Sequence, residues 1–349
     1  MYTGFQLGKL YHTGYSDQSL KCRILQESSI RSGRDAYMKF VLGIDSGGTK
    51  YRIRAADLSG NRIGESVGPC CSHYVLGIEG ARGAVEAAIH TFLASFDGKP
   101  EECMAITCGT TGWDSEEDGR IIKDVYLRLK GFSCPVICMN DVELAFYSVL
   151  GTYGVLALAG TGSILYGRNT EGEEARVGGW PKGIMGDEGS GRYIDALALQ
   201  HYSRYIDGCR PASSLTDAIA EVVGGPGRKR LMDFSAEVLL PECSSCDLAP
   251  IVNHAAETGD PWAVLILKEA AGALMNPLRE LITMLHMEKL DLIPVGIWGG
   301  VIMNCRIYQE EFRRLLAADY PNTVIMCPEK DAVTGAVELA LKQAETALG

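Results

Sequence analysis

Two stretches of the chain share one pattern of apolar and polar positions. Each has an apolar run, a glycine-rich turn and a run of alternating apolar and polar residues: "VLGIDSGGTKYRIRAAD" spans residues 41–57 and "GVLALAGTGSILYGRN" spans residues 154–169. A short apolar run is typical of a buried strand, and alternation is typical of a strand with one exposed face. Each stretch is therefore predicted to form a β-hairpin. Two hairpins of one plan indicate a duplicated fold with a cleft between its halves.

The remaining pattern places further strands and helices around these hairpins. Three short apolar runs, "CMAITCG" at 103–109, "CPVICMND" at 134–141 and "LIPVGIWGG" at 292–300, end at small or polar residues. Buried parallel strands have this pattern, and α/β sheets place their sites at the carboxyl ends of such strands. The chain from Gly189 onward is mostly helical in pattern, with the longest helix predicted over 261–285. The prediction is an α/β fold.

Residues 1–37 differ from the rest because they show neither a helical nor an alternating period. They also lack the run of about 7 to 15 apolar residues that a secretory signal contains. We expect a disordered leader or a mis-assigned start, since Met38 opens the first strand directly. We expect an N-terminal domain from residues 38–150 with 330–349, and a C-terminal domain from residues 151–329.

Composition limits the classes of function. With 349 residues, 46% of them hydrophobic and 22% charged, the chain is long enough for two globular domains. The formal net charge of −11 disfavours nucleic acid and anionic lipid as partners, since both require clustered Lys and Arg. No apolar run approaches the roughly 20 residues needed to span a bilayer. We therefore expect a small-molecule ligand, with no nucleic-acid and no membrane partner.

The chain contains 12 cysteines, and no secretory signal accompanies them. Reduced thiols in a cytoplasmic protein are the expectation. Cys243 and Cys246 form a single CxxC, and Cys134 and Cys138 flank a predicted strand. No second pair and no histidine cluster completes a zinc site, so none is predicted. Whether Cys243 and Cys246 bind a ligand is left open.

Seven motifs follow one another along the chain: "GIDSGGTK", "MND", "LALAGTGSI", "GGW", "GDEGSG", "WGGVIMN" and "GAVELAL". Together they resemble the N-acetylglucosamine kinase and BadF/BadG/BcrA/BcrD ATPase family, within the actin, sugar kinase and Hsp70 superfamily. The resemblance runs from Met38 to the C-terminus. It implies a duplicated RNase H-like fold, the actin-like ATPase fold, whose two domains close on ATP, Mg²⁺ and a sugar. It also implies a homodimer.

By this resemblance the glycine turns hold the nucleotide. A carboxylate beside a phosphate loop would repel phosphate, and the resemblance resolves this conflict by placing Mg²⁺, held through water, between Asp45 and the phosphate oxygens. From the residues alone, Asp45 could instead cap a turn, and the glycines could form ordinary turns. The residues assigned to the nucleotide are Asp45, Gly47, Gly48, Thr49, Thr161, Gly162, Gly299 and Gly300, and Asp45 is also assigned to the metal.

Asp141 is predicted to be the catalytic residue. It ends the run "VICMND" at the exit of a predicted strand. A sugar hydroxyl is a poor nucleophile, and a carboxylate within hydrogen-bond reach can orient it and accept its proton. Phosphoryl transfer otherwise requires mainly in-line positioning and charge neutralisation. The alternative is that Asp141 only caps the helix that follows.

The resemblance also assigns residues to the sugar. Asp187 matches the acid that binds sugar hydroxyls, although an acid there could instead cap a helix. Trp180 could stack on a sugar or fill the core. The chain departs from the family at two places assigned to the sugar. Ser72 stands where members that prefer N-acetylglucosamine commonly have Asn. The loop at residues 181–185 has five residues, where the resemblance leads us to expect four. The residues assigned to the sugar are Ser72, His73, Asn140, Ser163, Trp180 and Asp187.

These inferences predict ATP-dependent phosphorylation of an amino sugar hydroxyl, with N-acetylglucosamine converted to its 6-phosphate. N-acetylmuramic acid and plain hexoses remain open as acceptors. One alternative is an activator ATPase of a CoA-thioester reductase or dehydratase, which needs cluster-binding cysteines beside the phosphate loops, and "LALAGTGSI" has none. The other is a non-catalytic sugar sensor, which the presence of Asp45, Asp141 and Thr161 disfavours.

Overall fold

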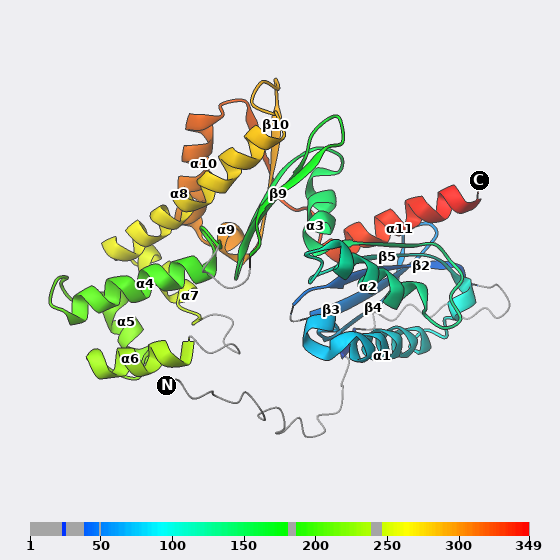
Figure 1. Ribbon diagram of the computed structural model, residues 1–349, viewed down its shortest axis with the longest axis horizontal. Helices are drawn as coiled ribbons and strands as arrows, with labels where there is room; N and C mark the ends of the chain where they lie inside the picture. Colours follow the sequence, from blue (N-terminus) through cyan, green and yellow to red (C-terminus); the bar gives the residue numbers. More distant parts are fainter. Residues whose placement is uncertain (1–22, 26–37, 49, 181–185, 239–245, 349) are drawn as a thin grey trace, which may run out of the picture.

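The two predicted hairpins lie in two separate sheets (Figure 1). The computed structural model describes residues 23–25, 38–48, 50–180, 186–238 and 246–348. The strands of the first sheet are β1 (Arg23–Leu25), β2 (Phe40–Ser46), β3 (Lys50–Asp57), β4 (Arg62–Pro69), β5 (Cys103–Thr110) and β6 (Val136–Asn140). Those of the second sheet are β7 (Gly154–Ala159), β8 (Ser163–Arg168), β9 (Glu174–Gly178), β10 (Ile293–Trp298) and β11 (Thr323–Met326).

The two sheets repeat one topology. Their strand orders are β1-β4-β3-β2-β5-β6 and β11-β10-β7-β8-β9, so that β4-β3-β2-β5-β6 corresponds to β9-β8-β7-β10-β11. In each sheet the first three of these strands are antiparallel neighbours, and the last two are parallel to the central strand. The predicted α/β class and the duplication are confirmed. The sequence did not predict β9 and β11, which lie at sheet edges and have no fully buried residue.

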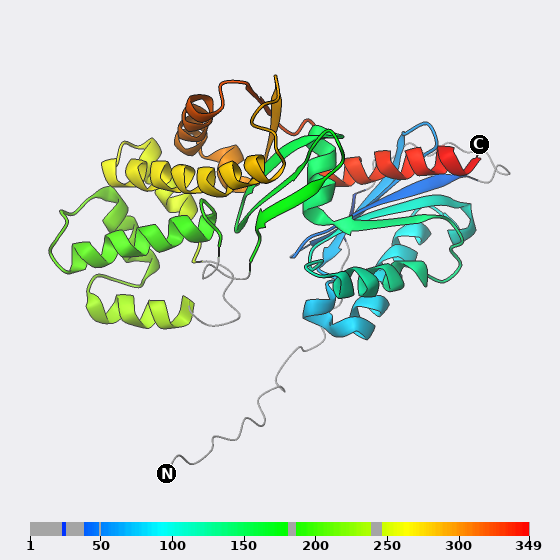
Figure 2. The same cartoon turned by 45° about the horizontal axis from the view of Figure 1, so that its top comes forward.

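Helices cover both sheets. They are α1 (His73–Ala94), α2 (Glu116–Leu127), α3 (Asp141–Leu150), α4 (Gly191–Ile206), α5 (Ser214–Val222), α6 (Arg228–Val238), α7 (Ala249–Glu257), α8 (Pro261–Met284), α9 (Gly300–Asn304), α10 (Arg306–Asp319) and α11 (Ala332–Leu348), with a 3₁₀ turn at Pro100–Glu102. Helices α1 and α2 pack on the first sheet in one core with Phe92 and Ile122. Helix α8, yellow in Figure 2, is buried through the core of the second half, which confirms the long helix predicted there.

Helices α3 and α11 follow corresponding strands, and each reaches across to the other sheet. Helix α3 follows β6 of the first sheet, yet Phe146 packs edge-to-face on Tyr166 of β8, with ring centroids 5.1 Å apart. Helix α11 follows β11 of the second sheet, yet Val337 packs in one cluster with Val41 of β2. Figure 1 shows α11, in red, lying along the first sheet. The two halves are therefore joined by an exchange of helices.

Little of residues 1–37 falls within the described part of the chain. Strand β1 pairs antiparallel with β4, with Arg23 opposite Val67. The other residues before Met38 lie outside the described residues, so the expected leader and the expected domain boundaries stay predictions. Among the described residues, no helix is both long enough and apolar enough to cross a membrane.

A glycine in the middle of β2 sets how closely α11 approaches the first sheet. A Cβ on Gly43 would lie 2.6 Å from the backbone nitrogen of Val337 and 2.8 Å from the carbonyl oxygen of Val333. We expect Gly43→Ala to lower the free energy of unfolding by about 1 to 3 kcal/mol, because α11 must move away from the sheet. The measurement is urea denaturation.

Gly64 in β4, a strand of the same sheet, provides the matched control. A Cβ there would lie 3.4 Å from the ring of Phe92, an ordinary van der Waals contact. Gly64→Ala should therefore change the free energy of unfolding by less than about 0.5 kcal/mol. Equal losses in the two variants would show that the contact between β2 and α11 is not the cause.

Candidate active site

Two carboxylates lie at the same edge of the first sheet. Asp45 is near the end of β2, and Asp141 begins α3 directly after β6. The strand register aligns the ends of three strands along this edge, because Ser46 of β2 is opposite Thr110 of β5 and Thr110 is opposite Asn140 of β6. The structure therefore brings the predicted metal residue and the predicted catalytic residue to one edge.

Burial changes the acidity of both carboxyl groups. It raises the pKa of Asp141 to about 6, and the negative charge of Asp45 adds to this effect. Burial also raises the pKa of Asp45, although the Arg52 guanidinium opposes this shift. Two partly buried carboxylates that repel each other favour a proton or a cation between them. Asp141 is thus a carboxylate whose pKa suits proton transfer near neutral pH.

The N-cap of α3 is Asn140 and not Asp141. The Oδ1 atom of Asn140 accepts a hydrogen bond from the Val142 N–H at 2.8 Å, and its Nδ2 donates to the Trp113 carbonyl at 3.0 Å. Asp141 therefore does not occupy the N-cap position that the alternative gave it, and its role as the base stays a prediction. The same contacts give the side chain of Asn140, predicted to face the sugar, two partners within the protein.

The first glycine turn connects β2 to β3 and is open to solvent. Gly48 is exposed, and a Cβ there would meet no heavy atom within 4 Å. At Gly47 the nearest atom would be a carbonyl oxygen 3.8 Å away. Neither glycine is therefore required by packing, and both leave the backbone accessible to a ligand. Thr49, which was also assigned to the nucleotide, lies outside the described residues.

A charged network lies behind this turn, and sequence reasoning missed it. Arg54 donates to Asp331 at 2.9 Å and to Glu65 at 2.7 Å, and Arg52 donates to Asp331 at 3.1 Å. Despite burial, hydrogen bonds from Thr334 and Arg54 lower the pKa of Asp331. The network ties the residue before α11 to β3. Its one sequence signal is the pair of arginines two positions apart, which places both on one face of the strand.

The second glycine turn, between β7 and β8, is held by the start of α4. The Gly191 N–H donates to the Gly160 carbonyl at 2.8 Å, and the Arg192 N–H donates to the Thr161 carbonyl at 3.2 Å. A Cβ on Gly162 would lie 2.7 Å from the Oδ1 of Asp187, so only glycine fits there without a shift. Thr161 itself is exposed.

Asp187 supports this turn from within. Its carboxylate accepts the Ser163 N–H at 3.0 Å and the Arg192 guanidinium at 3.1 Å, and its side chain is buried. Its backbone has a φ of 74°, a value that Asp and Asn tolerate better than most residues. The structure thus gives Asp187 and Ser163 a role in the shape of the turn. Their assignment to the sugar stays a prediction.

Gly299 and Gly300 lie beside the second turn. They follow β10, which is the parallel neighbour of β7, with Trp298 opposite Leu158. A Cβ on Gly299 would lie 2.5 Å from the Ala159 carbonyl oxygen, and its φ is 102°. Glycine is required here for both reasons. The structure therefore brings together the second phosphate turn and the diglycine that were both assigned to the nucleotide.

The remaining residues assigned to the sugar occupy different places. Ser72 is the buried N-cap of α1 and accepts the Tyr74 N–H at 3.3 Å, and the next residue, His73, lies 3.3 Å from the Asp118 carboxylate. Trp180 is exposed, and the five residues after it lie outside the described residues. One ion pair, from Arg176 of β9 to Asp114 at 3.1 Å, links this part of the second half to the first.

The described residues contain no cluster of three or more His, Cys, Asp or Glu side chains that could hold a metal ion. A cation held entirely by the protein is therefore not indicated in this part of the chain. Mg²⁺ usually keeps several waters and binds through one or two carboxylates together with substrate phosphates. Asp45 and Asp141, at one edge beside the first glycine turn, fit that kind of site.

Comparison with known proteins identifies similar kinases. A model of the BadF/BadG/BcrA/BcrD ATPase family matches residues 42–340. The chain is 31% identical over 309 residues to an N-acetylmuramic acid/N-acetylglucosamine kinase of Clostridium acetobutylicum, covering 88% of this chain and 100% of that protein. It is 30% identical over 315 residues to an N-acetyl-D-glucosamine kinase of Dictyostelium discoideum, covering 86% of this chain and 97% of that protein.

A solved structure shares the fold. It is that of a candidate N-acetylglucosamine kinase from Chromobacterium violaceum, with a TM-score of 0.69 and 24% sequence identity. The match covers 88% of this chain and 100% of that chain. At this identity the likeness establishes the fold, and the activity must be argued from the site.

The hydrogen bonds of Asp187 predict the effect of its removal. We expect Asp187→Ala to lower the free energy of unfolding by about 1 to 3 kcal/mol, because the buried Ser163 N–H loses its acceptor. Asp187→Asn keeps an oxygen for that N–H and tolerates the positive φ, so it should lose less. Urea denaturation and nucleotide affinity by calorimetry are the measurements.

The neighbouring acid supplies the control for this experiment. Glu188→Ala removes a half-buried carboxylate one position away and should change stability by less than about 0.5 kcal/mol. If Asp187→Ala were as stable as the parent and bound nucleotide equally well, Asp187 would not support the turn.

Proposed function

The chain belongs to the BadF/BadG/BcrA/BcrD ATPase family, and we propose that it uses ATP to phosphorylate a hydroxyl of an amino sugar. The acceptor we propose is N-acetylglucosamine, at its 6-hydroxyl. Two similar proteins that match almost over their full length are named as kinases of N-acetylglucosamine, and one of them also of N-acetylmuramic acid. A small-molecule sugar is therefore the partner that the chain shares with its relatives.

One observation carries the proposal: the carboxylate of Asp141 is partly buried, does not occupy the N-cap position of α3, and lies at the sheet edge of the first glycine turn. A group placed in this way can orient a sugar hydroxyl and accept its proton as the phosphoryl group transfers. Asn140 fixes the start of α3 and so fixes the direction of Asp141. The chain itself then needs to supply only positioning and one base.

The nucleotide is proposed to lie between the two glycine turns. Backbone N–H groups of Gly47 and Gly48 in the first turn, and of Thr161 and Gly162 in the second, bind the phosphates. Gly300, where a Cβ would meet only the Asn304 side chain at 3.8 Å, would leave room for the adenosine beside the second turn, next to Gly299. Mg²⁺, bound to the phosphates, would neutralise the charge that develops during transfer. Asp45 would hold it through water and orient it towards the first turn.

The two alternatives gain no support from the site. An activator ATPase needs cysteine ligands beside the phosphate turns, and the second turn, between β7 and β8, contains no cysteine. No cysteine in the described ranges takes part in a disulfide, and Cys243 lies outside those ranges. A sensor without turnover would not require a base with the pKa of Asp141.

A cytoplasmic location and a homodimer are proposed with this function, and size-exclusion chromatography with light scattering tests the dimer.

Replacing the base provides the first test of the function. Asp141→Asn cannot accept the hydroxyl proton, so kcat for N-acetylglucosamine should fall by about 10² to 10⁴. This corresponds to roughly 3 to 5 kcal/mol of barrier. The fold and the nucleotide affinity should be kept, because Asn140 caps the helix. Coupled ADP-release kinetics and calorimetry are the measurements.

Glu143, on the first turn of the same helix, is the matched control. Glu143→Gln removes a partly buried carboxylate that the mechanism does not use, and kcat should stay within a few-fold of the parent. If Asp141→Asn also turned over within a few-fold, Asp141 would not be the base and the mechanism would be wrong.

The raised pKa of Asp141 predicts the pH dependence. The base acts when deprotonated, so kcat/KM should fall as pH decreases through about 6. The pH dependence of kcat/KM reports the ionisation of groups in the free enzyme, before any phosphate-bound cation changes the pKa of Asp141. In the Asp141→Asn variant, the residual kcat/KM should not show this fall at low pH. A profile with no change between pH 5 and pH 7 would contradict the assignment of this fall to Asp141.

A further inference from the structure

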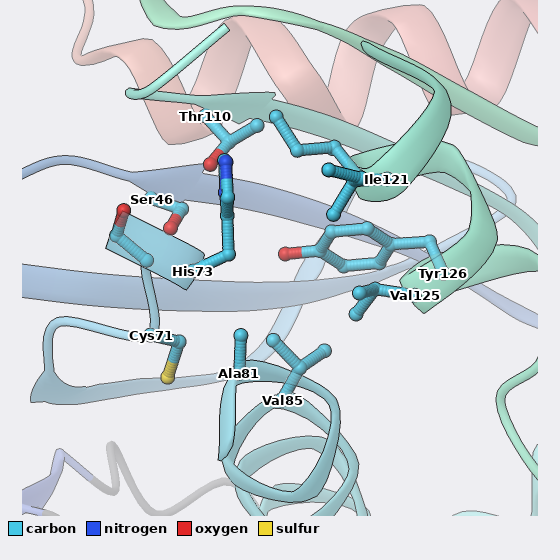
Figure 3. A pocket seen from close by; sticks show the side chains of 11 residues that line it. Ser46, Cys71, His73, Ala81, Val85, Thr110, Ile121, Val125 and Tyr126 are labelled. Atoms are coloured by element: carbon cyan, nitrogen blue, oxygen red, sulfur yellow. The ribbon is translucent and has the colours of Figure 1, made fainter. Parts of the chain in front are cut away.

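A small pocket opens in the first half between the sheet and helices α1 and α2 (Figure 3). Its floor is apolar. Ala81 and Val85 of α1 line it from below in Figure 3, and Val125 of α2 lines it from the side. Ile122 of α2 also lines the pocket. All four side chains are buried. The free space holds about one or two groups of the size of a water molecule or a methyl group.

The side of the pocket formed by the sheet lies beside the catalytic edge. Ser46 and Thr110, both buried, line this side, and they follow or neighbour the residues that place the two carboxylates. Thr110 is opposite Asn140, which directly precedes Asp141. Neighbouring strands are about 4.8 Å apart, so this side of the pocket lies one to two strand spacings from the base. A pyranose ring spans a similar distance between its 6-hydroxyl and the nitrogen on carbon 2.

The chemistry of the lining selects a neutral group with one polar end. Among the described residues, no Lys, Arg, Asp or Glu lines the pocket, so neither a carboxylate nor an ammonium finds a partner of opposite charge there. His73, which also lines it, faces Asp118. The Ser46 hydroxyl makes no hydrogen bond to any residue that the structure describes, and it can donate to a carbonyl oxygen on the sheet side of the pocket.

One polar group inside the pocket already has a partner. The Tyr126 hydroxyl reaches into the pocket in Figure 3, and this hydroxyl lies 3.0 Å from the hydroxyl of Tyr51. A ligand group that enters therefore meets apolar carbon and one tyrosine hydroxyl that already has a partner. An acetyl group matches this arrangement, with its oxygen at the serine and threonine of the sheet side and its methyl group on the floor.

We propose that this pocket receives the acyl group on the nitrogen of the amino sugar, and that its size selects acetyl over both a free amine and longer acyl groups. The proposal rests on the proposed kinase function. It assigns Ala81 and Val85 as specificity-determining residues, which act through the shape of the floor and take no part in phosphoryl transfer. N-acetylated sugars are then preferred because their methyl group leaves water for the pocket.

Two substitutions on α1 test the pocket in opposite directions. Ala81→Val fills the floor and should lower kcat/KM for N-acetylglucosamine by about 10- to 100-fold, while kcat/KM for glucosamine and glucose stays within a few-fold. Val85→Ala enlarges the floor and should raise the ratio of N-propionylglucosamine to N-acetylglucosamine. The measurement is ADP release across glucosamine, its N-acetyl, N-propionyl and N-butyryl derivatives, and glucose.

The control is Ala87→Val, the same substitution at an exposed position of α1, which should leave every ratio unchanged. Melting temperature and nucleotide affinity show that each variant is folded. The proposal is overturned if Ala81→Val lowers kcat/KM equally for all the sugars, or if Val85→Ala leaves the acyl-length preference unaltered. Failure of the kinase function is a separate result, since the parent would then release no ADP with any amino sugar.

Discussion

The exchange of α3 and α11 between the two sheets is the constraint on which the rest of the structure depends. Helix α11 can lie against β2 because Gly43 has no side chain, and it can cross α3 because Gly335 has none beside Ser148. Strand β2 leads directly to Asp45, and α3 begins with Asp141. The packing that joins the two halves therefore also fixes where the two carboxylates lie. Placing functional groups at the ends of packed elements gives them a defined geometry.

The polar residues of the candidate site divide into those proposed to meet the ligand and those that hold the backbone. Asn140 caps α3, Asp187 accepts the N–H groups and the guanidinium that shape the second turn, and Asp331 joins β3 to the start of α11. Each of these groups is satisfied within the protein. This support leaves Asp45 and Asp141 as the carboxylates with raised pKa at the first turn, which is the charge arrangement that a phosphate-bound cation stabilises.

The hairpins, the buried parallel strands and α8 could be predicted, because the burial of each depends on a local pattern of apolar residues. The pairing of Arg54 with Asp331 could not, since 277 residues separate them. Nor could the sequence decide between Asn140 and Asp141 as the cap, because both residues cap helices well. The pocket between α1 and α2 depends on how two helices pack, and no local pattern encodes that distance.

The position of α11 has a consequence for synthesis on the ribosome. The first sheet is made early, but the face of β2 and β5 that α11 covers stays open until the whole second half has been translated. Val41 and Ala105 are among the apolar residues on that face. Domains often fold one after another as they emerge, and exposed apolar surface invites aggregation. Here the first half cannot complete its core alone, so a nascent chain must be shielded until residues 332–348 emerge.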